Sequence, residues 1–202
     1  MQALALEVAP RARVGRFVYA VVVTILGSLL VAGLAQISIK LPFTPVPITG
    51  QTLGVLLVGA SLGPLLGALS LLLYIAEGSA GLPFFAGGES GWHGLFQPSL
   101  GFPSAGYLWG FVLASLLVGW LARRGWDRSV RSSIGAMFLG EIVIYAVGIP
   151  WLMSALNTPL EKTLELGLYP FVIGDTLKLL IAAGLLPLAW KGLSALRRRT
   201  ES

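Results

Sequence analysis

Two oppositely charged residues stand three positions apart inside the last apolar stretch of the chain. Asp175 and Lys178 belong to the segment GDTLK, and this spacing places both side chains on one face of a helix. We expect this helix to cross a lipid bilayer, with the pair close to the middle of the bilayer. Each charge there costs roughly 2.5–3.5 kcal/mol by insertion scales, and an ion pair within the helix recovers part of that cost.

Two interpretations of the pair are open. It can neutralise itself and hold two helices together, or it can line a site for a solute or an ion. We favour the second interpretation, because an interior cavity needs polar groups and a scaffold does not. Lys178 offers three donors and a positive charge to a carboxylate, while Asp175 accepts hydrogen bonds from N–H groups. Together they suit a ligand that carries both a carboxylate and N–H donors.

Four further polar residues are weaker candidates. Glu141, near the middle of its apolar stretch, is either a protonated or hydrogen-bonded helix contact or a site residue. Gln51, at the start of another stretch, is either a helix-end cap or a ligand contact. Glu77 is expected at the membrane interface. Glu89 lies in a glycine-rich loop and is a better ligand candidate than Glu77.

The composition places these residues in a membrane protein. Of the 202 residues, 55% are hydrophobic and 11% are charged, whereas soluble domains carry about a quarter charged residues. A single soluble core of this size cannot bury so much apolar side chain, but a bilayer solvates it. The absence of cysteine excludes a disulfide framework and a cysteine metal site. The net charge of +5 gathers at particular places rather than on one face, which argues against nucleic-acid binding.

Six apolar segments are candidate spans of an all-α integral membrane bundle. Their runs are continuous rather than alternating, which argues against a membrane β-barrel. The second segment is short and only Gly63-Pro64 separates it from the third, so five spans plus a re-entrant piece is an alternative. The six segments are approximately residues 16–39, 49–62, 64–80, 106–122, 132–156 and 168–193.

Basic residues predict the orientation of the bundle. With six spans, three basic clusters fall on one side, which is the cytoplasm, and only Lys40 and Lys162 face the other side. We therefore predict a cytoplasmic N-terminal segment at 1–16, a six-helix membrane domain at 17–193 and a basic cytoplasmic tail at 194–202. The clusters are Arg11, Arg13 and Arg16; Arg123, Arg124, Arg128 and Arg131; and Lys191, Arg197, Arg198 and Arg199.

Connecting segments on the outer side are unusual. The proline-rich stretch 41–47 is expected to be a stiff, extended strap, because proline fixes φ. The loop 81–104 is rich in glycine and aromatic residues and too apolar for a solvated linker, so we expect it to fold over the bundle as a lid. The stretch 158–166 is expected to be a short interfacial helix.

No enzyme, metal site or cofactor is expected. The sequence lacks the HExxH motif, a GxSxG motif with a partner histidine, and a P-loop, so any ATP-driven function needs an ATPase on another chain. The single histidine, His93, is expected to be structural or solvated. Ser28 and Ala32, four positions apart, form a small-residue face for close helix packing, either within the chain or against a partner helix.

Five motifs, in order and with matching spacing from about residue 17 to 192, resemble the BioY family, the biotin-binding S components of energy-coupling factor transporters. The resemblance implies a six-helix membrane fold in a prokaryotic cell membrane, with both termini cytoplasmic and a biotin pocket in the outer half. The implied partners are a transmembrane coupling protein and two ATPase subunits. The motifs are PVPITGQTLG at 45–54, LGP at 62–64, GLPFFAGG at 81–88, PSAGY at 103–107 and GDTLK at 174–178.

The resemblance also implies roles for single residues. Asp175 and Lys178 become ligand residues, and Glu89 occupies a lid position where the family often carries a polar ligand contact. The family more usually has a neutral residue there, and Thr-Gly-Gly where this chain has Ser-Ala-Gly at 104–106. The small-residue face of the family's first helix meets the coupling protein, and Ser28 and Ala32 lie on the corresponding face in this chain.

Biotin fits the candidate residues chemically. Its ureido N–H groups suit Asp175, while its carbonyl or carboxylate tail suits Lys178, and Gln51 and Glu89 are further polar candidates. An apolar wall with few polar groups is the usual form of a ligand site. The candidate wall residues are Tyr74, Phe84, Phe85, Trp92 and Tyr107.

Two other functions remain open from the residues alone. The chain is a stand-alone secondary transporter of a small carboxylated solute if Glu141 or Asp175 carries a proton. It is a membrane enzyme if one of these acids is an acid–base catalyst, but no nucleophile accompanies them.

Overall fold

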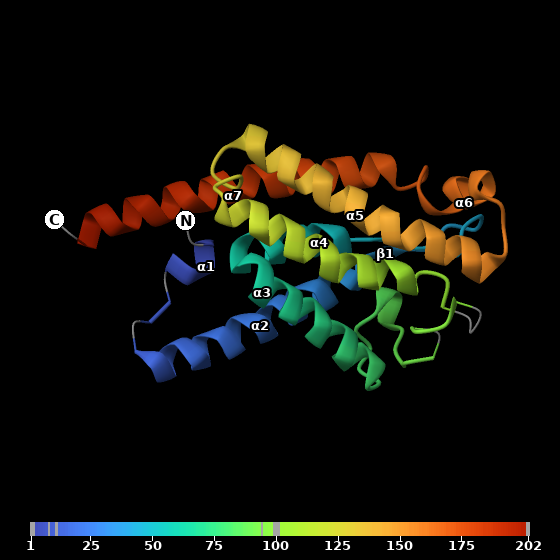
Figure 1. Cartoon of the computed structure of the whole chain (residues 1–202), viewed down its shortest axis with the longest axis horizontal. Helices are drawn as coiled ribbons and strands as arrows, with labels where there is room; N and C mark the ends of the chain where they lie inside the picture. The colour runs from blue at the N-terminus through green and yellow to red at the C-terminus, as the bar shows by residue number, and fades with distance from the viewer. Residues whose placement is uncertain (1–2, 8, 11, 94, 99–101, 201–202) are drawn as a thin grey trace.

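The computed structural model describes residues 3–7, 9–10, 12–93, 95–98 and 102–200. Arg11 of the predicted N-terminal basic cluster lies outside the described residues, as do residues 201–202 of the predicted C-terminal tail. The described part is a bundle of long helices, so the predicted all-α architecture is confirmed (Figure 1). Five helices are long and apolar enough to cross a membrane: α2 (Arg13–Ala35), α3 (Gln51–Ser79), α4 (Ala105–Arg123), α5 (Val130–Leu156) and α7 (Val172–Thr200).

Helix α3 is two antiparallel arms rather than one straight helix. Gly63 has φ 79° and ψ 178°, a non-helical conformation that glycine tolerates because it lacks a Cβ. The two arms lie against each other at Gly59 and Gly67, because a Cβ built on Gly67 would lie only 3.0 Å from the Cα of Gly59. The Gln51 side chain also donates a hydrogen bond to the Tyr74 hydroxyl. In a straight helix these two residues would be roughly 35 Å apart. The bundle therefore has six helical segments, and the first arm, roughly 18 Å long, is too short to cross a bilayer alone.

Helices α2 and α4 pack closely on this hairpin. A Cβ on Gly119 of α4 would lie 2.5 Å from the backbone at Gly63, so only glycine allows this approach. Ser28 is fully buried and donates to the Glu77 carboxylate of the second arm, and Ala32 is also buried. The small-residue face of α2 therefore packs inside the chain, and the structure does not leave it open to a partner helix.

The two ends of the bundle differ in content. Both termini, the Gly63 turn and the loop between α4 and α5 lie at one end, which we call the terminal end (Figure 1). The opposite end, the loop end, carries the proline-rich strap, the described residues of the segment 80–104 and helix α6. The remaining elements are α1 (Leu4–Glu7), β1 (Ser38–Ile39), β2 (Ile48–Thr49), the 3-10 helix η1 (Ala86–Gly88) and α6 (Leu160–Gly167).

The loop-end segments follow the predictions from sequence only in part. The strap 41–47 is not extended as predicted: it contains turns and bends, and it connects strands β1 and β2, which pair antiparallel, so the chain reverses direction here. In the lid segment, Phe85 and Leu95 are buried against the core, so this loop does fold onto the bundle. Helix α6 is the predicted short helix between α5 and α7.

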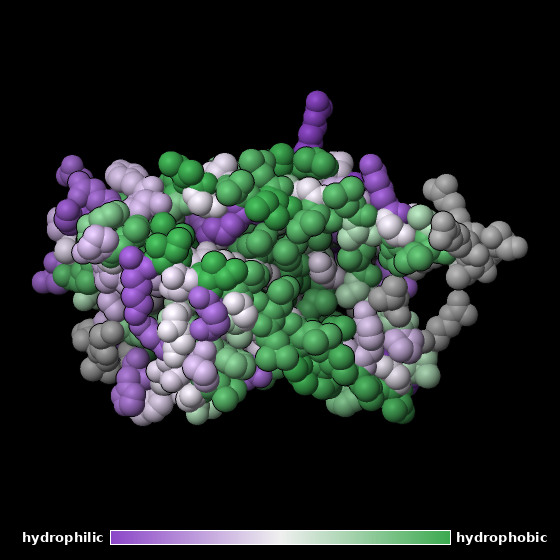
Figure 2. Space-filling model, turned by 180° about the vertical axis from the view of Figure 1, so that it is seen from behind, coloured by the Kyte–Doolittle hydropathy of each residue, from purple (hydrophilic) through white to green (hydrophobic). Residues whose placement is uncertain are grey.

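The outer surface of the helices is apolar. Figure 2 shows hydrophobic side chains across the middle of one face and hydrophilic side chains gathered mainly toward the ends. Valine, leucine, isoleucine and phenylalanine side chains of α2, α5 and α7 are exposed on this surface. An exposed apolar belt over long apolar helices is stable in lipid and not in water, so the chain is a membrane protein.

Candidate ligand-binding site

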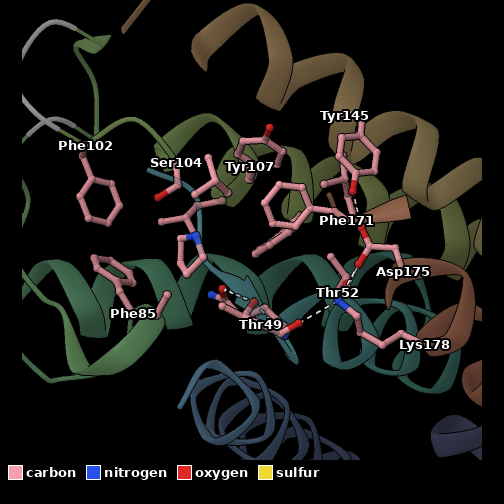
Figure 3. Close-up of a pocket in the computed structure, with 17 residues that line it drawn as sticks. Thr49, Thr52, Phe85, Phe102, Ser104, Tyr107, Tyr145, Phe171, Asp175 and Lys178 are labelled. Carbon is pink, nitrogen blue, oxygen red and sulfur yellow. Dashed lines mark hydrogen bonds and ion pairs between the residues drawn. The ribbon is translucent and has the colours of Figure 1, made fainter. Parts of the chain in front are cut away.

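A cavity of about 50 Å³ lies at the loop end among α3, α4, α5 and α7 (Figure 3). That volume holds only a few water molecules. The lining residues come from the strap, the lid segment and four long helices, so the site is assembled from distant parts of the sequence. They are Val46, Pro47, Thr49, Gln51, Thr52, Phe85, Ala86, Phe102, Ser104, Tyr107, Leu108, Phe111, Ile144, Tyr145, Phe171, Asp175 and Lys178.

The carboxylate of Asp175 accepts hydrogen bonds from several side chains around the cavity. Its Oδ1 atom accepts from Lys178 Nζ at 2.5 Å and from Thr52 Oγ1 at 3.1 Å, and its Oδ2 atom accepts from the Tyr145 hydroxyl. Donors from three helices therefore converge on one carboxylate that is only 6% exposed. Such convergence supplies a buried carboxylate with the hydrogen bonds that burial would otherwise deny it.

The depth predicted for the pair is wrong. Asp175 lies in the first turn of α7, because the helix begins only at Val172 after Pro170. The pair is therefore near the loop end of the bundle and not at the middle of the span. This position places the carboxylate at the positive end of the helix dipole, which lowers the cost of burying it.

Lys178 ties α7 to the start of α3. Besides Asp175, its Nζ atom donates to the Thr49 carbonyl at 2.8 Å and to Thr52 Oγ1 at 2.9 Å. All three ammonium donors thus have acceptors within the protein. The pair binds two helices together and also lines the cavity, so the two interpretations made from sequence are not exclusive.

Gln51 is fixed at the cavity wall by its neighbours. Its Oε1 atom accepts from Thr49 Oγ1 at 2.9 Å, and its Nε2 atom donates to the Tyr74 hydroxyl at 2.6 Å. Tyr74 is fully buried behind this wall and does not line the cavity itself. The amide of Gln51 has a second N–H group that this bond does not use.

Aromatic rings make up the other end of the cavity. Figure 3 shows Phe85 and Phe102 far from the Asp175–Lys178 pair, with Tyr107 and Phe171 between them. Phe85 packs edge-on against Tyr74, with ring centroids 5.7 Å apart, and lies the same distance from Phe102. The cavity therefore has one charged end and one aromatic end.

Tyr107 supports the wall through its ring. Its hydroxyl donates to the Gly167 carbonyl at 2.8 Å, which anchors α6 to α4. Its ring meets that of Tyr145 at 88°, with centroids 6.1 Å apart. Tyr107 thus holds in place the tyrosine that donates to Asp175.

Four predicted positions do not line the cavity: Tyr74, which lies behind its wall, Phe84, which packs partly buried against the core, and Glu89 and Trp92. Glu89 is half-exposed and pairs with Lys40 at 3.4 Å, so the structure does not bring it to the other candidates. Trp92 is exposed and stacks on His93, with centroids 4.7 Å apart. The cavity contains Phe85, but neither Glu89 nor Trp92 lines it.

Several lining residues were not identified from the sequence. Tyr145 follows Glu141 by four positions on α5, so the face already marked by that acid would have indicated it. Thr52 is adjacent to Gln51 and carries the second contact to Asp175. Phe102, Phe111 and Phe171 carry no local signal that separates them from ordinary apolar residues.

A second, open groove of about 550 Å³ runs between α5 and α7 on the outside of the bundle. Its walls are largely apolar, and they share Tyr145 and Asp175 with the first cavity. Glu141 also lines this groove, and both of its buried carboxyl oxygens lack a hydrogen-bond partner among the described residues. The wall between cavity and groove is therefore only one layer of side chains thick at this point.

A sequence model of the BioY family matches residues 7–195. The biotin transporter BioY of Rhizobium etli is 34% identical over 152 residues, which cover 72% of this chain and 78% of that relative. The biotin transporter BioY of Rhodobacter capsulatus is 36% identical over 169 residues, which cover 75% of this chain and 86% of that relative. The biotin transporter BioY of Thermotoga maritima is 35% identical over 145 residues, which cover 72% of this chain and 81% of that relative. The likeness thus extends over most of the chain.

The fold is also similar to a solved structure. A crystal structure of the S-component for biotin from an ECF-type ABC transporter superimposes with a TM-score of 0.78 and 26% sequence identity. The match covers 90% of this chain and 95% of that chain. The six helical segments and the loop-end elements therefore belong to one shared architecture.

Proposed function

Because this chain belongs to the BioY family, we propose that it is the biotin-binding membrane subunit, the S component, of an energy-coupling factor transporter. The observation that carries the proposal is the cavity, which joins a buried carboxylate to aromatic walls at the loop end. Biotin has matching parts, since its ureido ring offers N–H donors and its thioether ring is apolar.

The hydrogen bonds around Asp175 suggest how it meets the ureido ring. A carboxylate offers about four lone-pair sites, and Lys178, Thr52 and Tyr145 occupy three of them. The remaining site, on Oδ2, accepts a ureido N–H in our proposal. Lys178 has no spare donor, so it acts by holding Asp175 charged and oriented, and Gln51 offers its second N–H to the ureido carbonyl.

Entry of biotin requires the lid to move. The bicyclic ring of biotin is larger than the few water molecules that a cavity of about 50 Å³ can hold. Phe85 and Phe102 close the aromatic end, and both belong to the segment 81–104. We propose that this segment swings outward to admit biotin and returns to pack Phe85 on the ligand.

The basic clusters support an orientation with both termini in the cytoplasm. Residues 1–16 and 194–202 then lie on the cytoplasmic side, and the cavity opens toward the outside. The membrane domain corresponds to 17–193, although α2 starts at Arg13 and α7 continues to Thr200. In our proposal, a coupling protein and two ATPase subunits approach from the cytoplasmic side and supply the energy.

A titration of the detergent-purified chain with biotin tests the binding step. We expect saturable binding to one site per chain, measured by calorimetry. Desthiobiotin, which keeps the ureido ring and lacks the thioether ring, is expected to bind more weakly, because it loses apolar contact with the aromatic end. Absence of any binding signal for biotin contradicts the proposal.

Glu141 favours one alternative, a stand-alone proton-coupled transporter, because a buried acid without partners is suited to carry a proton. Uptake of labelled biotin into liposomes separates the two functions. We expect uptake only when the coupling protein, the ATPases and ATP are present. Uptake by the chain alone under a proton gradient contradicts the S-component proposal as stated and supports the alternative.

A further inference from the structure

A third, polar groove lies at the terminal end, far from the biotin cavity along α7. It has a volume of about 470 Å³ and is open to the surroundings. The loop between α4 and α5 forms one side, and the last turns of α7 form the other. Its lining residues are Arg128, Pro187, Trp190, Lys191, Ser194 and Ala195.

Trp190 is held in place in this groove by two neighbours. Its indole N–H donates to Asp127 Oδ2 at 2.6 Å, and the guanidinium carbon of Arg128 lies 4.2 Å from the ring centre. Asp127 is only 1% exposed, and burial raises the pKa of its carboxyl above the ordinary value. The ring positions Arg128 by a cation–π contact, without an ion pair.

Two exposed cations, Arg128 and Lys191, face this groove, and the carboxyl near Arg128 is that of the buried Asp127. Among the described residues, none of the ion pairs involves Arg128 or Lys191. The segments 124–129 and 187–196 contain no acid except the buried Asp127. The groove is therefore a positively charged hollow whose cations are available to an external anion.

The position of the groove along α7 indicates which kind of molecule carries that anion. The apolar stretch of α7 ends at Trp190, and Lys191 begins the basic end of the helix. Tryptophan is enriched where the hydrocarbon meets the head groups, and basic pockets beside membrane helices bind lipid phosphates. Arginine also binds phosphate oxygens with two parallel hydrogen bonds.

We propose that this groove binds the head group of an anionic phospholipid. Arg128 and Lys191 contact its phosphate, and the indole of Trp190 lies beside its glycerol backbone. Leu185 and Leu188, exposed on the preceding turn of α7, continue into the region of the acyl chains. This site does not depend on the biotin proposal, because it shares no residue with the biotin cavity.

Titration of the detergent-purified full chain with phosphatidylglycerol, followed by native mass spectrometry, tests the site. Each basic residue near an anionic lipid contributes roughly a fivefold factor in affinity, so the double variant Arg128→Gln/Lys191→Gln is expected to bind about 30-fold more weakly. The matched control is Arg124→Gln. Arg124 also stacks on a tryptophan, at 3.6 Å from the Trp120 ring, but does not line the groove. We expect this control to bind like the unmodified chain.

Two other titrants identify the ligand. Phosphatidylcholine and free glycerol phosphate are expected to bind at least about tenfold more weakly than phosphatidylglycerol, because one is zwitterionic and the other lacks acyl chains. Equal losses in Arg124→Gln and in the double variant overturn the proposal, as does equal binding of phosphatidylcholine. If the double variant keeps its lipid affinity but no longer joins the coupling protein, the groove is a protein-docking surface and the proposal is wrong. A melting temperature equal to that of the unmodified chain shows that the double variant is folded.

Discussion

Asp175 and Glu141 are two equally buried acids on neighbouring helices, yet their hydrogen-bond partners differ. Each is 6% exposed, and both line the groove between α5 and α7. Asp175 accepts hydrogen bonds from three side chains, including a lysine, whereas Glu141 accepts none among the described residues. Burial of an acid alone therefore does not identify a ligand site. The hydrogen-bond donors that converge on the acid identify the site.

Helix position explains part of this difference. Asp175 lies in the first turn of α7, where the helix dipole favours negative charge, whereas Glu141 lies inside α5. No described residue donates a hydrogen bond to the Glu141 carboxyl, so its position lacks the donors that orient Asp175. We therefore assign ligand recognition to the surroundings of Asp175 and not to those of Glu141.

Removal of the lysine is expected to have the largest effect. Lys178→Ala leaves Asp175 buried without its cation, and breaking such a pair costs about 2–5 kcal/mol, so biotin affinity should fall at least about thirtyfold. Calorimetry measures the affinity. The control is Lys162→Ala on α6, where an exposed pair with Glu165 contributes little. Equal affinities for the two variants contradict the role given to Lys178.

Removal of the tyrosine donor is expected to have an intermediate effect. Tyr145→Phe deletes one of three donors to Asp175, and a hydrogen bond to a charged group contributes about 1.5–3 kcal/mol. Biotin affinity should therefore fall about tenfold. Tyr169→Phe, at an exposed tyrosine ahead of α7, is the matched control and should bind normally in the same titration. If Tyr145→Phe also binds normally, Asp175 does not need this donor.

A smaller effect is expected at the lid acid. Glu89 lies outside the cavity and pairs with Lys40 at the surface, and such pairs contribute about 0–1 kcal/mol. Glu89→Gln should therefore change biotin affinity by less than about fivefold in a titration. A larger loss indicates that the lid rearranges on binding and brings Glu89 to the ligand, as the family resemblance implies.

The smallest effect on binding is expected at the acid without partners. Glu141→Gln keeps the size of the side chain and removes only the possibility of a charge. We expect biotin affinity within about threefold of the unmodified chain and a melting temperature that is unchanged or higher. A strong loss of affinity would show that Glu141 takes part in the site through the thin wall at Tyr145.

The ion pair around Asp175 could be predicted from the sequence, but its depth in the bundle could not, and this failure has a physical cause. The spacing of Asp175 and Lys178 on one helix face predicted their ion pair, because helical neighbours need no tertiary information. The depth of the pair was missed, because apolar residues of the loop before α7 extend the apolar stretch beyond the helix itself. Helix boundaries are set by packing and capping, which composition does not record.

The aromatic end of the cavity was only partly predictable. Phe85 was identified by its place in a glycine-rich lid motif, and it lines the cavity. Phe111 and Phe171 were not, because their inward orientation depends on how α4, and α7 with the turn before it, pack against the α3 hairpin. That packing depends on close approaches at Gly59 and Gly119, and the sequence alone does not place these glycines against their neighbours.

One paired titration tests the central claim most directly. Asp175→Asn and Glu141→Gln make the same chemical change, carboxyl to carboxamide, at two acids of equal burial on adjacent helices. With biotin as the titrant, we predict that Asp175→Asn weakens binding at least about tenfold, roughly 1.4 kcal/mol, while Glu141→Gln binds like the unmodified chain. Equal losses in both variants, or a loss confined to Glu141→Gln, would contradict the assignment of biotin recognition to Asp175 and its donors.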